Sequence, residues 1–139
     1  HYTPIGNRIF SHVALVFATI YTALISTNYY VQLTLVAPHL ISGEIESVRF
    51  LVFTPFDSFL YSVDILGYSF MSLSTLFAGF AFQKGPVRSF LIANGLILPF
   101  IALQTYYHPL IWPASLWAIT FPGSTISLAR LFKNRLSET

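Results

Sequence analysis

The stretch that decides the fold is IFSHVALVFATIYTALISTNYYVQLTLVAPHLISG, residues 9–43, which contains no Asp, Glu, Lys or Arg. A helix needs about 20 apolar residues to cross the roughly 30 Å of hydrocarbon in a membrane. The stretch exceeds that length, and it also exceeds the apolar core of a signal peptide, which has about 7 to 15 residues. We therefore predict a membrane-spanning helix over residues 9–36 that tilts or projects beyond the bilayer.

Two more charge-free stretches follow, at residues 65–83 and at residues 89–129, where His108 is the only titratable basic side chain. The longer of the two has room for two helices. The segment YHPLIWP, residues 107–113, divides it, because two prolines interrupt helical hydrogen bonding and aromatic side chains favour the membrane interface. The remaining predicted spans are therefore residues 56–82, 87–107 and 109–132.

The composition also indicates a protein that lies in a membrane. The chain has 139 residues, of which 55% are hydrophobic, 17% aromatic and 9% charged, whereas about 25% of residues are charged in a soluble domain. Spanning segments must satisfy their backbone hydrogen bonds internally, and no alternating ten-residue pattern suggests a barrel. The predicted fold is all-α, a single domain over residues 1–139 that forms an integral membrane bundle of four transmembrane helices. The sequence starts at His1, which leaves room for an upstream helix.

Basic residues orient the bundle. With the N-terminus inside, six of the seven Lys and Arg residues fall on the cytoplasmic side, and only Arg49 falls outside. The six are Arg8, Lys84, Arg88, Arg130, Lys133 and Arg135. The positive-inside rule predicts such a split, so both termini are expected in the cytoplasm. Because these residues form no patch, and the net charge is only +2, nucleic acid is not an expected partner.

The first outer loop is the one sizeable polar segment. Ser42 is predicted to cap a short helix with Glu44 and Glu46 in its first turn, where acids interact well with the helix dipole. Three apolar residues of this loop share one helical face: Ile45, Val48 and Val52. We therefore expect a short interfacial helix on the outer membrane surface. Asp57 is predicted to cap the second span.

Asp64 is the most informative single residue. It lies inside the second span, about 12 Å along the helix from Phe56, and placing Asp at a helix centre costs about 2.5 to 3.5 kcal/mol. Its side chain should therefore face the bundle interior. Two interpretations carry equal weight: a site for a proton, cation or ligand, or a structural hydrogen bond to a Tyr, Ser or Gln on a neighbouring helix.

Polar side chains gather in the outer half of the predicted bundle. On the second helix, Tyr61, Asp64 and Tyr68 lie along one side, with Asp57 before them and Met71 after them. Buried amides, phenols and a carboxylate can together orient a small ligand. The predicted ligand-binding residues are Gln32, Asp64, Tyr68, Gln104, Tyr107 and His108. For the aromatic residues at helix ends, a lipid-interface belt is the competing explanation, and it is favoured for Tyr29, Tyr30, Tyr106 and Trp112.

Catalytic and metal sites lack support. The absence of cysteine excludes disulfides, thiolate metal sites and Cys nucleophiles. His12 belongs to the opposite end from His39 and His108, so at most the latter two could meet Glu44 or Asp57. No Gly-x-Ser-x-Gly elbow or phosphate-binding glycine loop is present. We therefore predict no catalytic residue and no metal site, and the sequence does not identify a cofactor.

Four short motifs stand out between residues 29 and 73: YYVQLT at residues 29–34, Gly43-Glu44, LGY at residues 66–68 and MSL at residues 71–73. In these motifs the chain resembles a group of small bacterial multi-pass membrane proteins. In that group a carboxylate shortly precedes Leu-Gly-Tyr, and Asp64 occupies its place. The resemblance covers about half of the chain, implies a membrane fold of four or more helices, and implies no activity. The expected location is a bacterial inner membrane.

Three functions remain open. The first is a non-enzymatic membrane protein that binds or moves a small amphipathic molecule or ion through an outer-facing polar cavity. The second is an accessory or assembly subunit of a larger membrane complex, favoured by small size and small-residue-rich helix faces. The third, an intramembrane enzyme, is the least supported. The expected partners are membrane lipid, a small ligand, and further copies of the chain or other subunits.

Overall fold

The computed structural model describes residues 4–136, and these residues form helices and connecting turns with no β-strand. Three helices are long and apolar enough to cross a membrane: Ile5–Ser42, Phe59–Ala81 and Pro86–Leu103. The all-α prediction is therefore confirmed for this part of the chain, together with three of the candidate spans. The fourth predicted span, residues 109–132, corresponds to two helices that do not meet this measure.

The first span is a single helical rod of 38 residues. It consists of a turn at Ile5–Asn7, helix α1 (Arg8–Val31), a π-helical segment Gln32–Val36 and helix α2 (Ala37–Ser42). In the π segment the Ala37 N–H donates to the Gln32 carbonyl, five residues earlier. Pro38 follows at the start of α2, and its missing N–H weakens the α-helical ladder at this point.

The rod ends at Gly43, whose φ of 81° is left-handed and suits glycine. The chain then folds back through α3 (Ile45–Val48) and a 3-10 turn at Arg49–Leu51. We call residues 37–51 the outer hairpin, after the side of the membrane on which the sequence predicts it. The predicted loop helix is thus present but only four residues long. The predicted Ser42 cap is wrong, because Ser42 is the last residue of α2 and its hydroxyl donates to the His39 carbonyl.

Helix α4 (Phe59–Ala81) is the central element of the bundle. Its N-cap is Ser58, whose Oγ accepts the Tyr61 N–H at 3.2 Å and the Thr54 N–H at 3.1 Å. The predicted Asp57 cap is therefore wrong by one residue: Ser58 is buried and already turned toward the helix, whereas Asp57 is exposed. A serine at this position satisfies one of the first free N–H groups of the helix.

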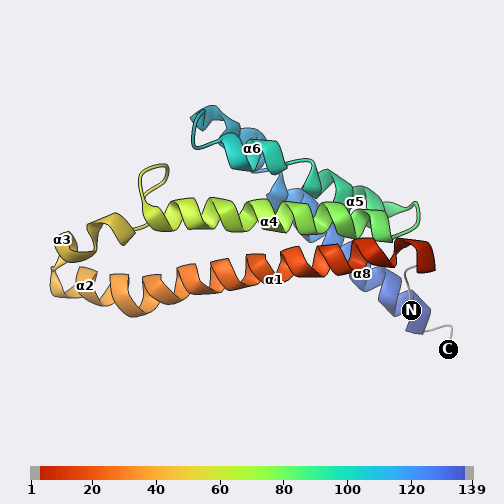
Figure 1. Ribbon diagram of the computed structural model, residues 1–139, viewed down its shortest axis with the longest axis horizontal. Coiled ribbons are helices and arrows are strands. Elements are labelled where there is room, and N and C mark those ends of the chain that lie inside the picture. The colour runs from red at the N-terminus through yellow and green to blue at the C-terminus, as the bar shows by residue number, and fades with distance from the viewer. Residues whose placement is uncertain (1–3, 137–139) are drawn as a thin grey trace.

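Helix α1 packs along α4, and the two run antiparallel (Figure 1). The Phe17 ring lies between Phe70 and Phe77, with centroids 5.8 and 5.7 Å away. Near the start of α1, the Ser74 hydroxyl donates to the Ala14 carbonyl at 2.9 Å. These contacts fix the register of α1 against α4, which also brings Asn28 of α1 next to Asp64 of α4.

The third span is broken into α5 (Pro86–Gly95) and α6 (Leu98–Leu103). Pro99 has no N–H to donate to the Gly95 carbonyl, so the chain turns through Leu96 and Ile97 with a three-residue hydrogen bond from Ile97 N to Asn94 O. At the same point α5 approaches α4 closely. A Cβ on Gly95 would lie 2.4 Å from the Leu76 Cβ and 2.7 Å from its Cα, so glycine is required here.

The chain then continues through a 3-10 turn (His108–Leu110), α7 (Ile111–Ala114) and α8 (Trp117–Leu136). Helix α8 packs against α5, where Gly123 lies against the Phe90 ring. Pro122 interrupts its first turns, and Arg130 and Lys133 lie in its later turns, which lowers its hydropathy. Figure 1 shows the start of α1, the α4–α5 connection and the end of α8 at one end of the molecule, opposite the outer hairpin. We call this the basic end.

Candidate functional site

Asp64 finds its partner on α1. The Asn28 Nδ2 donates to Asp64 Oδ1 at 3.1 Å, and the Gln32 Nε2 donates to Asn28 Oδ1 at the same distance. Asn28 is fully buried, with 0% of its surface exposed. The relay Gln32–Asn28–Asp64 therefore bridges the first two candidate spans, and these hydrogen bonds use Oδ1 of the carboxylate.

Asp64 also borders a cavity of about 330 Å³, which we call the α4–α8 cavity. Its walls come from α4, the end of α6, α7 and the start of α8. The polar and aromatic lining residues are Tyr61, Asp64, Tyr68, Gln104, Ser115 and Trp117. The apolar lining residues are Ile65, Ile101, Ile111 and Ala114. The break at Pro99 and the turn before α7 create this space, because they move α6 and α7 out of line with a straight helix.

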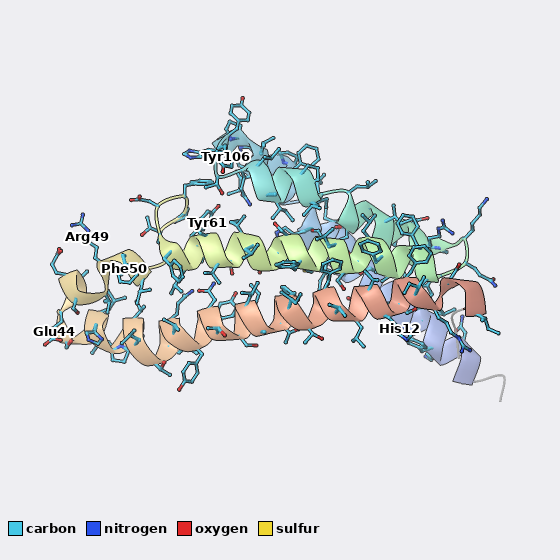
Figure 2. The ribbon with its side chains drawn as sticks, in the orientation of Figure 1. His12, Glu44, Arg49, Phe50, Tyr61 and Tyr106 are labelled. Atoms are coloured by element: carbon cyan, nitrogen blue, oxygen red, sulfur yellow. The ribbon has the colours of Figure 1, made fainter. Side chains whose placement is uncertain are left out.

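Tyr61 is an unsatisfied polar group in the wall of this cavity. Its side chain is only 6% exposed, and its hydroxyl has no hydrogen-bond partner within residues 4–136. Figure 2 shows Tyr61 on the side of α4 that faces α6. Because a buried hydroxyl without a partner costs free energy, this group is a candidate contact for a bound molecule.

Gln104 is the second buried polar group of the wall, with 4% of its surface exposed. Its Nε2 donates to the Ile101 carbonyl at 3.1 Å, which holds the amide beside the cavity. A glutamine side chain carries two donor hydrogens and a carbonyl acceptor. The amide therefore keeps capacity to bind a ligand.

Aromatic rings surround the carboxylate. Tyr68 lies 5.4 Å from Trp117 and 6.1 Å from Tyr21, measured between ring centroids. Such separations fall in the range of favourable aromatic pairs. They place an electron-rich surface beside Asp64, on the same helix and one turn away.

A loop residue in an uncommon conformation contacts Tyr61 of the cavity wall. Phe56 has a φ of 67°, the only positive φ of a non-glycine residue within the described chain. Its ring stacks on His108 at 4.0 Å and contacts Tyr61 edge-on at 5.2 Å. A bulky residue adopts this conformation only where surrounding contacts hold it. The stack thus joins the loop before α4 to the turn before α7.

The six predicted ligand-binding residues divide into three groups. Asp64, Tyr68 and Gln104 line the cavity, and Gln32 reaches Asp64 only through Asn28. His108 stacks on Phe56 instead of facing the cavity. Tyr107 is 62% exposed and does not line it. The turn at His108–Leu110 carries both of these side chains away from the interior.

Sequence reasoning missed Asn28, and it left Tyr61, Ser115 and Trp117 out of the site. One signal for Asn28 was available. Asn28 and Gln32 are four residues apart, a spacing at which amide side chains meet on a helix. For Trp117 no signal existed, because its place depends on how α8 packs.

A second polar network lies away from the cavity. The Asn94 Nδ2 donates to Thr75 Oγ1 at 2.9 Å, and the Thr120 hydroxyl donates to Asn94 Oδ1 at 2.7 Å. Asn94 is 0% exposed. This network ties α4, α5 and α8 together with both ends of the amide in use, so we assign it to packing.

Within residues 4–136, no group of three or more His, Asp or Glu side chains is arranged to hold a metal ion. Comparison of the chain with models of known families, with characterised proteins and with solved structures finds no match. The candidate site is therefore defined by geometry and chemistry.

Proposed function

We propose that this chain is a four-span inner-membrane protein with both termini in the cytoplasm, and that it binds or moves a small amphipathic molecule or ion through the α4–α8 cavity. The observation that carries the proposal is a cavity of about 330 Å³ whose wall brings Asp64, Gln104 and Tyr61 together. Ligand pockets combine a mostly apolar wall with a few convergent polar groups, and this cavity has that composition. No step of the proposal needs a nucleophile or a metal.

The charge distribution supports the orientation. Arg8 begins α1, Lys84 and Arg88 flank the α4–α5 connection, and Arg130 and Lys133 lie toward the end of α8. All five belong to the basic end (Figure 1), and Arg49 belongs to the outer hairpin, as labelled in Figure 2. Placing the basic end in the cytoplasm makes α8 the fourth span and places the α4–α8 cavity in the outer half of the bundle.

Cysteine accessibility tests the cavity directly. The chain contains no cysteine, so each introduced thiol is a clean reporter. Ser115→Cys places a thiol in the cavity wall, and we expect it to react with a membrane-impermeant methanethiosulfonate added outside intact cells. Ile119→Cys, on an exposed side of α8, is the control and should react little, because lipid suppresses thiolate formation. Equal, slow reaction at both positions would contradict an outward-opening polar cavity.

A second function, an accessory subunit of a membrane complex, is favoured by the outer hairpin. Ile41 is 89% exposed and Phe50 is 65% exposed. Both residues belong to the outer hairpin, which precedes the start of α4. Apolar groups left outside the bilayer indicate a binding surface. Purification in a mild detergent tests this function: a stoichiometric protein partner lost in the Ile41→Glu variant would support it, whereas a homogeneous chain without partner would count against it.

A further inference from the structure

In the described part of the chain, the lining of the α4–α8 cavity carries a negatively charged side chain and no positively charged one. Asp64 is the only Asp, Glu, Lys or Arg among the described residues that line it. The ion pair found within residues 4–136, Arg49 with Glu46 at 3.7 Å, lies at the surface of the outer hairpin. Asp64 therefore has an amide neighbour and no cationic one. A carboxylate offers about four acceptor positions, and the Asn28 amide occupies one of them.

Three aromatic rings add to this negative surface. Tyr61, Tyr68 and Trp117 all line the cavity together with Asp64, and Tyr68 and Trp117 are neighbours at 5.4 Å. The face of an aromatic ring attracts a cation within about 6 Å of its centroid, most strongly for Trp. A carboxylate beside several such rings is a combination that recognises ammonium groups.

The rest of the wall limits the kind of cation. Ile65, Ile101 and Ile111 form an apolar surface, which favours a ligand with a hydrocarbon body. A bare metal ion is disfavoured, because Mg²⁺ and Ca²⁺ take about six or more oxygen ligands, and the cavity presents few. An anion is disfavoured because no Lys or Arg of the described chain lines the site.

We propose that the ligand of the α4–α8 cavity is a lipophilic organic cation, an amine or quaternary ammonium, whose charged group lies between Asp64 and the rings of Tyr68 and Trp117. This inference rests on the proposed function and names its ligand class. Tyr61, whose hydroxyl is buried and unpartnered within the described residues, belongs to the same wall. The hydrocarbon part of the ligand lies against the isoleucines.

The test uses two probes of one shape, phenyltrimethylammonium and its uncharged isostere tert-butylbenzene. Trp112→Phe removes the exposed tryptophan and leaves Trp117, in the cavity wall, as the fluorescent reporter. Each probe is titrated into this protein in dodecylmaltoside micelles. We expect saturable quenching by the cation at a concentration at least about tenfold lower than for the isostere.

Three carboxylate variants in the same background sharpen the result. Asp64→Asn should weaken cation binding at least about tenfold, and Asp64→Glu should restore most of it, because charge and not side-chain length is required. Asp57→Asn removes an exposed carboxylate outside the cavity and should leave binding unchanged. Folding of each variant is checked by its elution as a single species and by its helical circular dichroism.

The outcomes separate the ligand class from the cavity itself. If tert-butylbenzene binds as tightly as the cation and Asp64→Asn changes nothing, the cation inference is overturned while a binding cavity remains. If neither probe produces saturable quenching, both the inference and the proposed function fail. Displacement of the cation by dihexanoyl phosphatidylcholine would support the inference and identify a lipid headgroup as the source of the ammonium, whereas lack of displacement would support it with a free amine as ligand.

Discussion

At the scale of single residues, the buried polar groups differ in how completely they are satisfied. The amides of Asn94 and Asn28 each donate one hydrogen bond and accept another. The Tyr61 hydroxyl neither donates nor accepts one within the described chain. A buried polar group that is fully bonded stabilises the fold, whereas an unbonded one costs stability and gains by meeting a ligand. The contrast separates packing residues from candidate binding residues.

Tyr61→Phe should therefore stabilise the ligand-free protein. The variant removes a hydroxyl that is buried without a partner and keeps the ring contacts with Phe53 and Phe56, so the free energy of unfolding should rise by roughly 1 kcal/mol. Thermal unfolding in dodecylmaltoside measures the change. Tyr106→Phe, at a position 88% exposed, is the matched control and should have no effect. A clear loss of stability in Tyr61→Phe would show that the hydroxyl has a partner after all.

Asn28→Leu should have the opposite effect. Without the amide, Asp64 loses its donor on α1 and Gln32 loses its acceptor, which should lower the free energy of unfolding by about 1 to 2 kcal/mol. Unfolding titrated with sodium dodecyl sulfate gives the value. The double variant Asn28→Leu with Asp64→Leu should cost at least about 0.5 kcal/mol less than the sum of the single variants. Strict additivity would mean that the two side chains do not interact.

At the scale of helices, α4 holds the bundle together through close contacts made by small residues. On one side Gly67 lies against Ile25 of α1, and on the other Gly79 lies against Ile92 of α5. Small residues let helix backbones approach in lipid, where dispersion contacts drive association. The contact of Gly95 with Leu76 is the tightest of these, because the atoms that a side chain would meet include backbone.

Gly95→Ala should consequently disrupt the α4–α5 contact. The new methyl group would meet the Leu76 Cα at 2.7 Å and its N at 2.9 Å, so the two helices must separate, at a cost of about 1 to 3 kcal/mol. The same unfolding measurements report the loss. Gly6→Ala is the matched control, because nothing lies within 4 Å of its Cβ position. If both substitutions behave alike, the two helices do not approach as closely as described.

The elements also show where sequence reasoning succeeds. Charge-free stretches predicted the three helices that are long and apolar enough to cross a membrane, because the length of an apolar run is a local property. The break at Pro99 was missed, although proline is a known helix breaker, since hydropathy continues unchanged across it. The partner of Asp64 was also beyond the sequence. Which side of α1 meets α4 depends on packing, so a glutamine, serine or tyrosine was expected where Asn28 lies.

At the scale of the whole molecule, the positions of the helix ends lead to a testable prediction of how many times the chain crosses the membrane. The start of α1, the α4–α5 connection and the end of α8 share the basic end, and the outer hairpin lies opposite (Figure 1). An even number of crossings follows if the basic end stays on one side. The hydropathy of α8 alone does not decide this point, because its later turns carry Arg130 and Lys133.

Single cysteines can decide it. We expect Ser47→Cys, in the outer hairpin, to react with an impermeant maleimide added to intact cells, and Gln83→Cys and Lys133→Cys, at the basic end, to react only after the membrane is opened. All three native side chains are exposed, so slow reaction would report sidedness instead of burial. The unmodified chain, which has no cysteine, is the blank. Labelling of Lys133→Cys in intact cells would contradict the four-span topology.

The pairing of α1 with α4 has a consequence for how the protein is made. Residues 43–81 must still be synthesised after the first rod is complete, which takes about 2 to 8 s at about 5 to 20 residues per second. During that time α1 waits in lipid without its partner. In the first rod, the Thr19, Thr22 and Thr34 hydroxyls donate to carbonyls of the rod itself, and Gln32 donates to Asn28. The rod thus satisfies several of its polar groups internally, and the Asn28 Nδ2 gains its acceptor when Asp64 arrives.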